Sequence, residues 1–294
     1  MSFRTVSITK RCKLETQLNY LVVRADTETR ILIDEISVLI VANTQCSMTA
    51  ACISKLLDHK VKIIFCDSQW NPQAEVVGYH DHYAPYGVLK KQLSWTKELS
   101  DNMWNQVIRN KLYRQSWVLS SRGYVDVARV ILEYADNVSD GDVTNREGLA
   151  AKLYFETLFG LGFNRRDPTD IKNVYLNYGY SVILSCVNRE LSAAGYLLQL
   201  GIHHIGESNP FNLGCDLVEP IRPFVDEILL DRELTILNYK REMVSVLQTQ
   251  VSWSGRTSIM ENAIHSYVRS VLSALENNDV QSVSFIRPLK DEQL

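Results

Sequence analysis

The sequence predicts an α+β protein, with a small β-sandwich-like N-terminal domain followed by a larger all-α domain. Two observations carry this prediction. Short β-branched runs separated by polar turns fill residues 1–80. From Val88 onward the apolar residues recur at helical spacing, as in Trp104, Ile108 and Leu112. A chain of 294 residues is long enough for two such domains.

The N-terminal domain is expected to span residues 1–80. Its strands are expected at the runs richest in β-branched residues, which are Thr5–Ile8, Tyr20–Arg24, Ile31–Asp34, Ser37–Val41, Val61–Cys66 and Glu75–Tyr79. Residues 48–57 have a helical pattern and are expected to pack on the sheet. The linker is expected at residues 81–90, and because the stretch His80–Gly87 (HDHYAPYG) marks this junction, His80 and His82 are interpreted as linker histidines.

The all-α domain is expected to span residues 91–294. Its helical segments are expected near residues 88–100, 102–120, 122–135, 145–160, 178–194, 213–250 and 259–276. Ser258 and Glu261 have the spacing of a capping box at the start of the last segment. Residues 280–294 show no strong period.

Composition and charge are those of an ordinary globular protein. The chain is 46% hydrophobic and 22% charged, with a formal net charge of −3. This charge counts mildly against nucleic-acid binding, although a local basic patch would be enough for it. The six cysteines follow no zinc-like spacing and suit a reducing compartment. Because no signal peptide or membrane-spanning run is apparent, we expect a cytoplasmic protein.

Residues 201–223, GIHHIGESNPFNLGCDLVEPIRP, hold the densest group of potential metal ligands. His203 and His204 lie in a polar loop, and Asp216 and Glu219 are spaced so that their carboxylates share one helix face. The prolines that follow predict a bend there. Histidine with carboxylates is a donor set of divalent-metal sites that handle phosphate. A solvated acidic face is the commoner explanation of such a pair, and the spacing alone leaves both open.

Glu147 is the third acidic candidate. Thr144 and Glu147 have capping-box spacing, in which the glutamate bonds back to the cap amide. Glu147 also shares a helix face with Ala151 and Tyr154, where a carboxylate is costly unless it is paired or binds a metal. The local sequence therefore leaves both roles open.

Basic residues gather with tryptophan and tyrosine on three expected helices. They are Lys90, Lys91, Arg109, Lys111, Arg114, Arg122 and Arg129. Such residues can position phosphates, although a solvated helix face is the default for any one of them. The phosphate-loop, nucleophile-elbow and zinc-protease motifs are all absent from the sequence, which argues against those enzyme classes.

Four blocks in this order resemble the CRISPR-associated integrase family, the catalytic subunit of the spacer-acquisition complex. The blocks are Arg146-Glu147-Gly148-x-Ala150-Ala151-Lys152-x-Tyr154-Phe155, residues 176–181 (LNYGYS), residues 201–204 (GIHH) and residues 209–223 (NPFNLGCDLVEPIRP). The resemblance covers the whole chain and is nearest to the type II-A form.

The resemblance implies a metal-dependent DNA integrase and endonuclease of CRISPR adaptation. In this chemistry a DNA 3′-hydroxyl attacks a phosphodiester, which inserts spacer DNA into the CRISPR array. The resemblance implies Mg²⁺ or Mn²⁺ bound by Glu147, His204 and Glu219, with Asp216 either a further ligand or a partner behind one. Glutamate at position 219 is a departure, since many members have aspartate there.

The resemblance also implies partners. They are double-stranded DNA (the spacer precursor and the CRISPR repeat), a second copy of the chain in a homodimer, and a small ferredoxin-like CRISPR-associated subunit that completes a larger hetero-oligomer. The domain of residues 91–294 would be catalytic, and that of residues 1–80 would serve dimerisation and partner contacts. The alternative is a non-catalytic DNA-binding scaffold with a decayed metal site.

Overall fold

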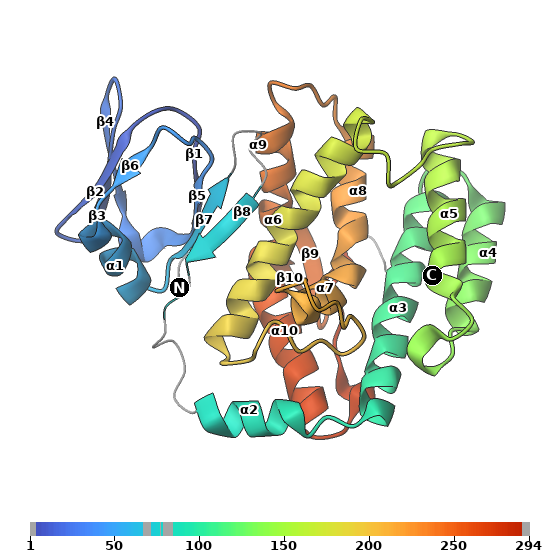
Figure 1. Ribbon diagram of the computed structural model, residues 1–294. Coiled ribbons are helices and arrows are strands. Elements are labelled where there is room, and N and C mark those ends of the chain that lie inside the picture. The colour runs from blue at the N-terminus through green and yellow to red at the C-terminus, as the bar shows by residue number, and fades with distance from the viewer. Residues whose placement is uncertain (1–3, 67–71, 77, 79–84, 290–294) are drawn as a thin grey trace. The chain divides into compact units, whose positions relative to one another are not determined.

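The computed structural model describes residues 4–66, 72–76, 78 and 85–289. The chain divides into two compact units, one of residues 1–83 with 192–194, the other of residues 84–191 and 195–294. The first unit is built on β-sheets and the second is mostly helical (Figure 1), which confirms the expected fold class. No helix among the described residues is both long and apolar enough to cross a membrane.

The first unit contains two four-stranded sheets. One has the order β1-β5-β7-β8 and consists of β1 (Arg4–Ile8), β5 (Ile36–Val41), β7 (Lys62–Cys66) and β8 (Pro72–Val76). Its first three strands are parallel, and β8 is antiparallel to β7. The other has the order β4-β3-β2-β6 and consists of β2 (Lys13–Gln17), β3 (Tyr20–Arg24), β4 (Glu28–Leu32) and β6 (Ser47–Met48).

Burial explains which strands the sequence predicts. Every residue of β5 is buried, and its uninterrupted apolar run is typical of a central parallel strand. Only Leu14 of β2 is fully buried, so β2 lacks the apolar alternation that would have predicted it. Helix α1 (Ala50–Asp58) starts after Thr49, whose hydroxyl accepts a hydrogen bond from the Cys52 amide at 3.1 Å.

The second unit holds the remaining described helices. They are α2 (Pro85–Leu93), α3 (Lys97–Ser120), α4 (Val125–Asp136), α5 (Arg146–Phe159), α6 (Ile171–Ala193), α7 (Asn212–Val218), α8 (Arg222–Asp231), α9 (Tyr239–Val244) and α10 (Met260–Glu276). Figure 1 shows α3 running beside α4 and α5, which pack on it. Helix α2 occupies residues 85–90 of the expected linker, whereas His80 and His82 lie outside the described residues.

The expected helical stretch of residues 213–250 is divided into α7, α8 and α9, and proline lies at the first of the breaks. Between α7 and α8 lies a 3-10 turn, Glu219–Ile221, with Pro220 inside it and Pro223 in the first turn of α8. Proline lacks the amide that continues a helix ladder, so the chain bends at this point. The predicted bend is confirmed, and it turns the backbone beside Glu219.

The second unit also contains a small sheet that the sequence pattern does not predict. It has the order β10-β9-β11, with β9 (Gln250–Trp253), β10 (Arg256–Ile259) and β11 (Arg287–Pro288). Ser254 and Gly255 both have positive φ, the geometry of a tight hairpin turn between β9 and β10. Strands of two to four residues are too short to show a period.

The expected capping box of Ser258 and Glu261 is wrong. Helix α10 has no side-chain cap, and the Met260 amide donates to the carbonyl of Thr249 at 2.8 Å. The Glu261 carboxylate instead accepts from Arg189 at 3.1 Å. A backbone hydrogen bond to Thr249 thus takes the place of a side-chain cap at the start of α10.

Candidate metal centre

Two of the predicted ligands converge on a single buried lysine in the second unit. The Lys111 ammonium, on α3, donates to Glu147 Oε1 at 2.5 Å and to Glu219 Oε2 at 2.6 Å. Glu147 comes from the first turn of α5 and Glu219 from the turn between α7 and α8. The two carboxylates are therefore no farther apart than two hydrogen bonds to one nitrogen allow.

The Glu147 side chain is free to reach Lys111 because other side chains cap the helix that carries it. Asp142 accepts from the amides of Arg146 at 2.8 Å and Glu147 at 2.9 Å, and Asn145 accepts from the Gly148 amide at 3.2 Å. These bonds satisfy the free amides at the start of α5. The capping-box interpretation of Thr144 and Glu147 is wrong, and the Glu147 side chain points to Lys111 instead.

Glu219 is a buried carboxylate with a cation on each oxygen. Arg222 lies 2.9 Å from Oε1, Lys111 lies at Oε2, and only 2% of the residue is exposed. Burial alone would raise the pKa of Glu219, but the charges of Arg222 and Lys111 outweigh it and hold the pKa below its usual value. The carboxylate therefore stays ionised, as a metal ligand must be.

Asp216 fixes the loop that carries His204. One of its oxygens accepts from the amides of Ile202 at 2.6 Å and His203 at 3.1 Å. The other accepts from the His204 amide at 3.0 Å and lies 2.6 Å from His204 Nδ1. Both oxygens of this wholly buried carboxylate thus serve the loop. This is the arrangement of a partner behind a ligand rather than of a ligand.

The Asp216 contact also sets the chemistry of the His204 ring. A carboxylate at Nδ1 selects the tautomer with its proton there and leaves Nε2 as the acceptor, the usual state of a metal-binding histidine. The hydrogen bond that His204 donates to Asp216 outweighs the opposing effect of burial and raises the pKa of His204, and the charge of Glu219 adds to the rise. The ring is thus electrostatically linked to both acids.

His203 has a separate structural role. Its ring stacks on buried Trp104 at 4.1 Å with an interplanar angle of 2°. Trp104 and Lys111 stand two helical turns apart on α3, so one helix face supports both the loop and the carboxylates. His203 therefore packs on the face of Trp104, whereas His204 hydrogen-bonds to Asp216.

The donor chemistry fits a divalent cation. Carboxylate oxygens suit Mg²⁺ and Mn²⁺, and an imidazole is accepted by Mn²⁺. Within the part of the chain that the structure describes, no three His, Cys, Asp or Glu side chains are already grouped so that they could hold an ion. The Lys111 ammonium lies between two of the predicted ligands. A position between two carboxylates that holds an ammonium group also suits a metal cation.

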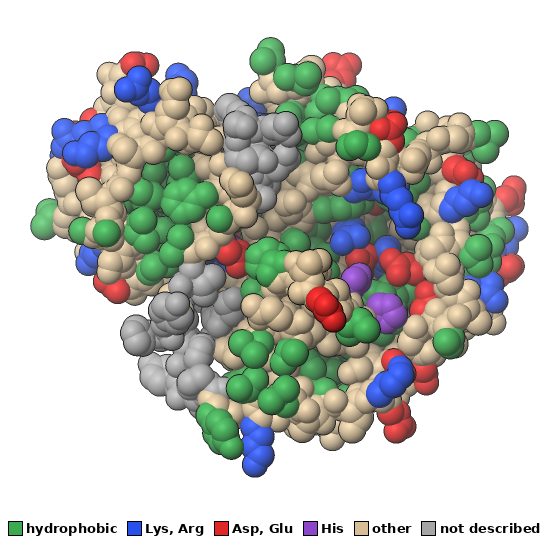
Figure 2. Space-filling model, viewed as in Figure 1, with side chains coloured by type: hydrophobic (Ala, Val, Ile, Leu, Met, Phe, Trp, Pro, Cys, Tyr) green, Lys and Arg blue, Asp and Glu red, His purple; other side chains and the backbone are tan. Residues whose placement is uncertain are grey.

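A hollow opens beside His204. It has a volume of about 440 Å³, and its lining includes Gln92, Trp95, Gly201 and Asn212. Figure 2 shows histidine side chains in a hollow on this face, with acidic and basic side chains around them. A substrate could therefore reach the His204 side of the candidate centre from solvent.

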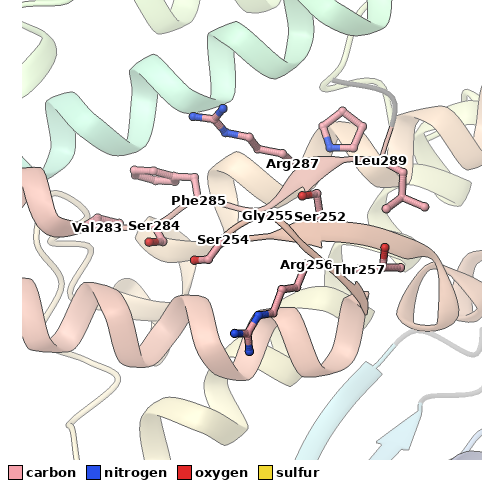
Figure 3. Close-up of a pocket in the computed structure, with 11 residues that line it drawn as sticks. Ser252, Ser254, Gly255, Arg256, Thr257, Val283, Ser284, Phe285, Arg287 and Leu289 are labelled. Carbon is pink, nitrogen blue, oxygen red and sulfur yellow. The ribbon is translucent and has the colours of Figure 1, made fainter. Parts of the chain in front are cut away.

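A second hollow, of about 500 Å³, lies on the small sheet of the second unit. Its lining contains no aspartate, glutamate or histidine, so it offers no carboxylate or imidazole ligand for a metal. Figure 3 shows the side chains of Arg256 and Arg287 pointing away from each other, which leaves no converging positive charge for a phosphate. The candidate metal ligands therefore lie around Lys111 and not at this second hollow.

Comparison with known proteins agrees with the fold and the motifs. Residues 6–243 match the family model of the CRISPR-associated protein Cas1. The chain belongs to the Cas1 family. Along its whole length it is 31% identical to the CRISPR-associated endonuclease Cas1 of Neisseria meningitidis serogroup C (strain 8013), and it covers 99% of that protein.

Solved structures share the Cas1 fold. A casposase bound to integration product aligns with a TM-score of 0.74 and 19% identity over 95% of this chain and 91% of that one. A chain of a Cas6-RT-Cas1–Cas2 complex aligns with a TM-score of 0.77 and 17% identity over 98% of this chain. This chain spans 36% of that longer one. At these identities the likeness is one of fold.

The sequence pattern alone does not predict the role of Lys111 in this Cas1 family member. Lys111 is one of seven basic residues expected on helices, with a solvated face as the default for each. A signal was present, because Lys111 lies between Ile108 and Leu112 in the apolar stripe of α3 and two turns from Trp104. A lysine on a buried stripe requires buried partners.

Proposed function

We propose that this Cas1 family member is a divalent-metal-dependent DNA strand transferase and endonuclease of CRISPR adaptation. The observation that carries the proposal is the convergence of Glu147 and Glu219 on one cation beside the oriented ring of His204. The endonuclease name of the Neisseria relative and the integration product in the casposase structure support the reaction class. The resemblance to the type II-A form remains a prediction.

Glu147, His204 and Glu219 would hold the ion, with Mg²⁺ or Mn²⁺ as the suitable metals. Such an ion, when bound, lowers the pKa of an attacking hydroxyl and neutralises charge on the phosphodiester. Asp216 orients the His204 ring and, in the neutral ring, holds the proton on Nδ1, which leaves Nε2 to bind the ion. Arg222 and Lys111 place two positive charges beside the acids, which lowers the cost of bringing an anionic phosphodiester to them.

DNA and two protein partners belong to the same proposal. The DNA would be double-stranded, the chain would form a homodimer, and the Cas1–Cas2 complex among its structural neighbours supports a second CRISPR-associated subunit. Several of the basic residues that could position phosphates are paired with acids of their own chain: Arg109 with Asp136, Arg114 with Glu227, Arg122 with Asp231 and Arg129 with Asp126. A basic DNA path would therefore be completed by assembly. A cytoplasmic location stays a prediction.

The test is strand transfer and cleavage of labelled DNA duplexes with Mn²⁺, using Glu147→Gln, His204→Ala and Glu219→Gln. Each variant should lose at least about a hundredfold in rate, because each removes a proposed ligand. Glu156→Gln, at a glutamate on the same helix as Glu147, is the matched control and should stay within a few-fold of the wild type.

Two results would contradict the proposal. Normal strand transfer by all three ligand variants would remove the site assignment. DNA binding by the wild type without cleavage or transfer at any metal concentration would instead support the non-catalytic scaffold. Circular dichroism of each variant separates loss of the site from loss of the fold.

A further inference from the structure

We propose that the Lys111 ammonium is a resident cation at the position proposed for the metal, so that a divalent ion must displace it to bind. The inference deepens the proposed function and rests on it. Lys111 donates to both proposed carboxylate ligands, at 2.5 Å and 2.6 Å, with its own side chain only 7% exposed. Arg222, the other cation there, occupies the second oxygen of Glu219.

The ammonium and the metal compete for the same oxygens. A magnesium ion bonds carboxylate oxygens at about 2.0–2.1 Å, so an ion bound to Glu147 Oε1 and Glu219 Oε2 would lie almost on the ammonium. Two cations at that separation repel strongly in a buried setting. The lysine stem is flexible, with four carbons, so its ammonium can swing away without movement of α3. Binding of the metal therefore requires the lysine to leave both oxygens.

The charge balance of the site gives a second consequence. Two carboxylates face two cations, Lys111 and Arg222, so the charges within this group of four side chains nearly cancel. A divalent ion gains less from such a centre than from two unpaired acids. A DNA phosphate would add negative charge and give the displaced ammonium a new acceptor. We therefore expect DNA to tighten metal binding, with Lys111 as the link between the two.

The direct test is a Mn²⁺ titration of the full-length protein without DNA, read from the electron paramagnetic resonance of free Mn²⁺. Lys111→Met should bind Mn²⁺ about tenfold more tightly than the wild type or better, because a competing charge is gone. It should also melt at a lower temperature without metal and recover with Mn²⁺. A DNA duplex should tighten binding in the wild type more than in the variant.

Two controls sharpen this measurement. Lys97→Met removes an exposed lysine from the same helix, where it pairs with Asp101, and should leave Mn²⁺ affinity unchanged. Lys111→Arg retains the charge and should keep the weak binding of the wild type. Should Lys111→Met not fold, the same titration of Lys111→Gln decides, with tighter binding than the wild type again the expected result.

Equal or weaker Mn²⁺ binding by the neutral variants would overturn the inference. That outcome is separate from failure of the proposed function, which would appear as Mn²⁺ binding unaffected by Glu147→Gln and Glu219→Gln. Loss of binding in the glutamate variants together with unchanged binding in Lys111→Met would preserve the metal site and reject the role of the lysine.

Discussion

At the scale of single residues, one buried carboxylate holds the loop of the candidate centre. Asp216 is wholly buried and satisfies three consecutive backbone amides, of Ile202, His203 and His204, as well as the His204 ring. An ionised acid is stable there because every lone pair direction is used. Its function is thus to position His204 and to set which ring nitrogen is free.

We expect Asp216→Asn to weaken Mn²⁺ binding by roughly tenfold to a hundredfold, the usual effect of losing the partner behind a metal ligand. The nitrogen of the new side-chain amide would face at least one N–H group of the loop, and two donors cannot hydrogen-bond to each other. Because the Asp216 contact raises the pKa of His204, the variant should also lower that pKa toward its ordinary value. Nitrogen NMR of the His204 ring measures both the tautomer and the pKa without any DNA. An unchanged ring spectrum would contradict the positioning role.

The sequence identifies the candidate ligands more readily than the residues that hydrogen-bond to them. The motifs predict Glu147, His204 and Glu219, and the structure brings the two glutamates to one nitrogen. The capping box at Glu147 was wrong because Asp142, outside the motif, reaches the same amides. The partnership with Lys111 crosses from α3 to α5, and no local pattern contains a contact between separate helices.

At the scale of elements, the loop between α6 and α7 is irregular yet well bonded. Gln92 of α2 donates to the carbonyls of Leu197 at 2.8 Å and Leu200 at 3.1 Å and accepts from the Leu197 amide at 2.9 Å. Asn212 of α7 donates to the carbonyls of Gln199 and Gly206, both at 3.0 Å. Side chains of two helices thus replace the backbone ladder that the loop lacks.

Gly201 lies at the tightest point of this loop. A Cβ there would stand 2.3 Å from the His204 carbonyl oxygen and 2.8 Å from an Asp216 oxygen. We expect Gly201→Ala to displace the loop, lower the free energy of unfolding by about 1–3 kcal/mol and reduce Mn²⁺ affinity. Chemical denaturation and the Mn²⁺ titration measure the two effects.

Gly206 in the same loop supplies the control for that variant. Its Cβ would meet no atom closer than 3.5 Å, an ordinary contact. Gly206→Ala should therefore leave both stability and metal binding near those of the wild type. Equal effects of the two substitutions would mean that general loop stiffness, not the close approach at Gly201, governs the site.

Elements were predicted where periodic burial is strong and missed where it is weak. Helix α3 and the strand β5 have long buried faces and were expected close to their observed positions. The strands β2, β9 and β11 are short or mostly polar, and part of their pairing is with strands distant along the chain, β2 with β6 and β9 with β11. Register and pairing of such strands are tertiary properties that a sequence window does not contain.

At the scale of the whole molecule, buried acids outside the candidate centre couple stability to pH. Asp226 of α8 is 1% exposed and accepts from the hydroxyls of Tyr154 on α5 at 3.0 Å and Tyr180 on α6 at 2.5 Å. It therefore joins three helices of the second unit through one carboxyl group. Burial raises its pKa to about 6 and outweighs the hydrogen bonds of Tyr180 and Tyr154, which lower it.

The sign of the resulting pH effect follows from that raised value. Between the ordinary pKa of 3.8 and about 6 the folded chain holds a proton that the unfolded chain has lost. The contribution of Asp226 to stability is therefore greatest at acidic pH and is lost as the pH rises through this window. Above about pH 6 the folded protein carries an ionised acid in a buried place, which costs free energy.

Asp226→Asn removes this cost while keeping a group that can hydrogen-bond both tyrosines. We expect the variant to be more stable than the wild type at pH 8, by up to about 3 kcal/mol. The gain should shrink as the pH falls from 6 to 4 and vanish below the ordinary pKa of 3.8, where Asp226 is neutral in both states. Asp231→Asn, at the exposed end of the same helix, should change stability by less than about 1 kcal/mol at any pH. Denaturant unfolding from pH 4 to pH 8 provides the comparison. A variant destabilised equally at every pH would show that the geometry of the tyrosine hydrogen bonds, and not the buried charge, dominates at Asp226.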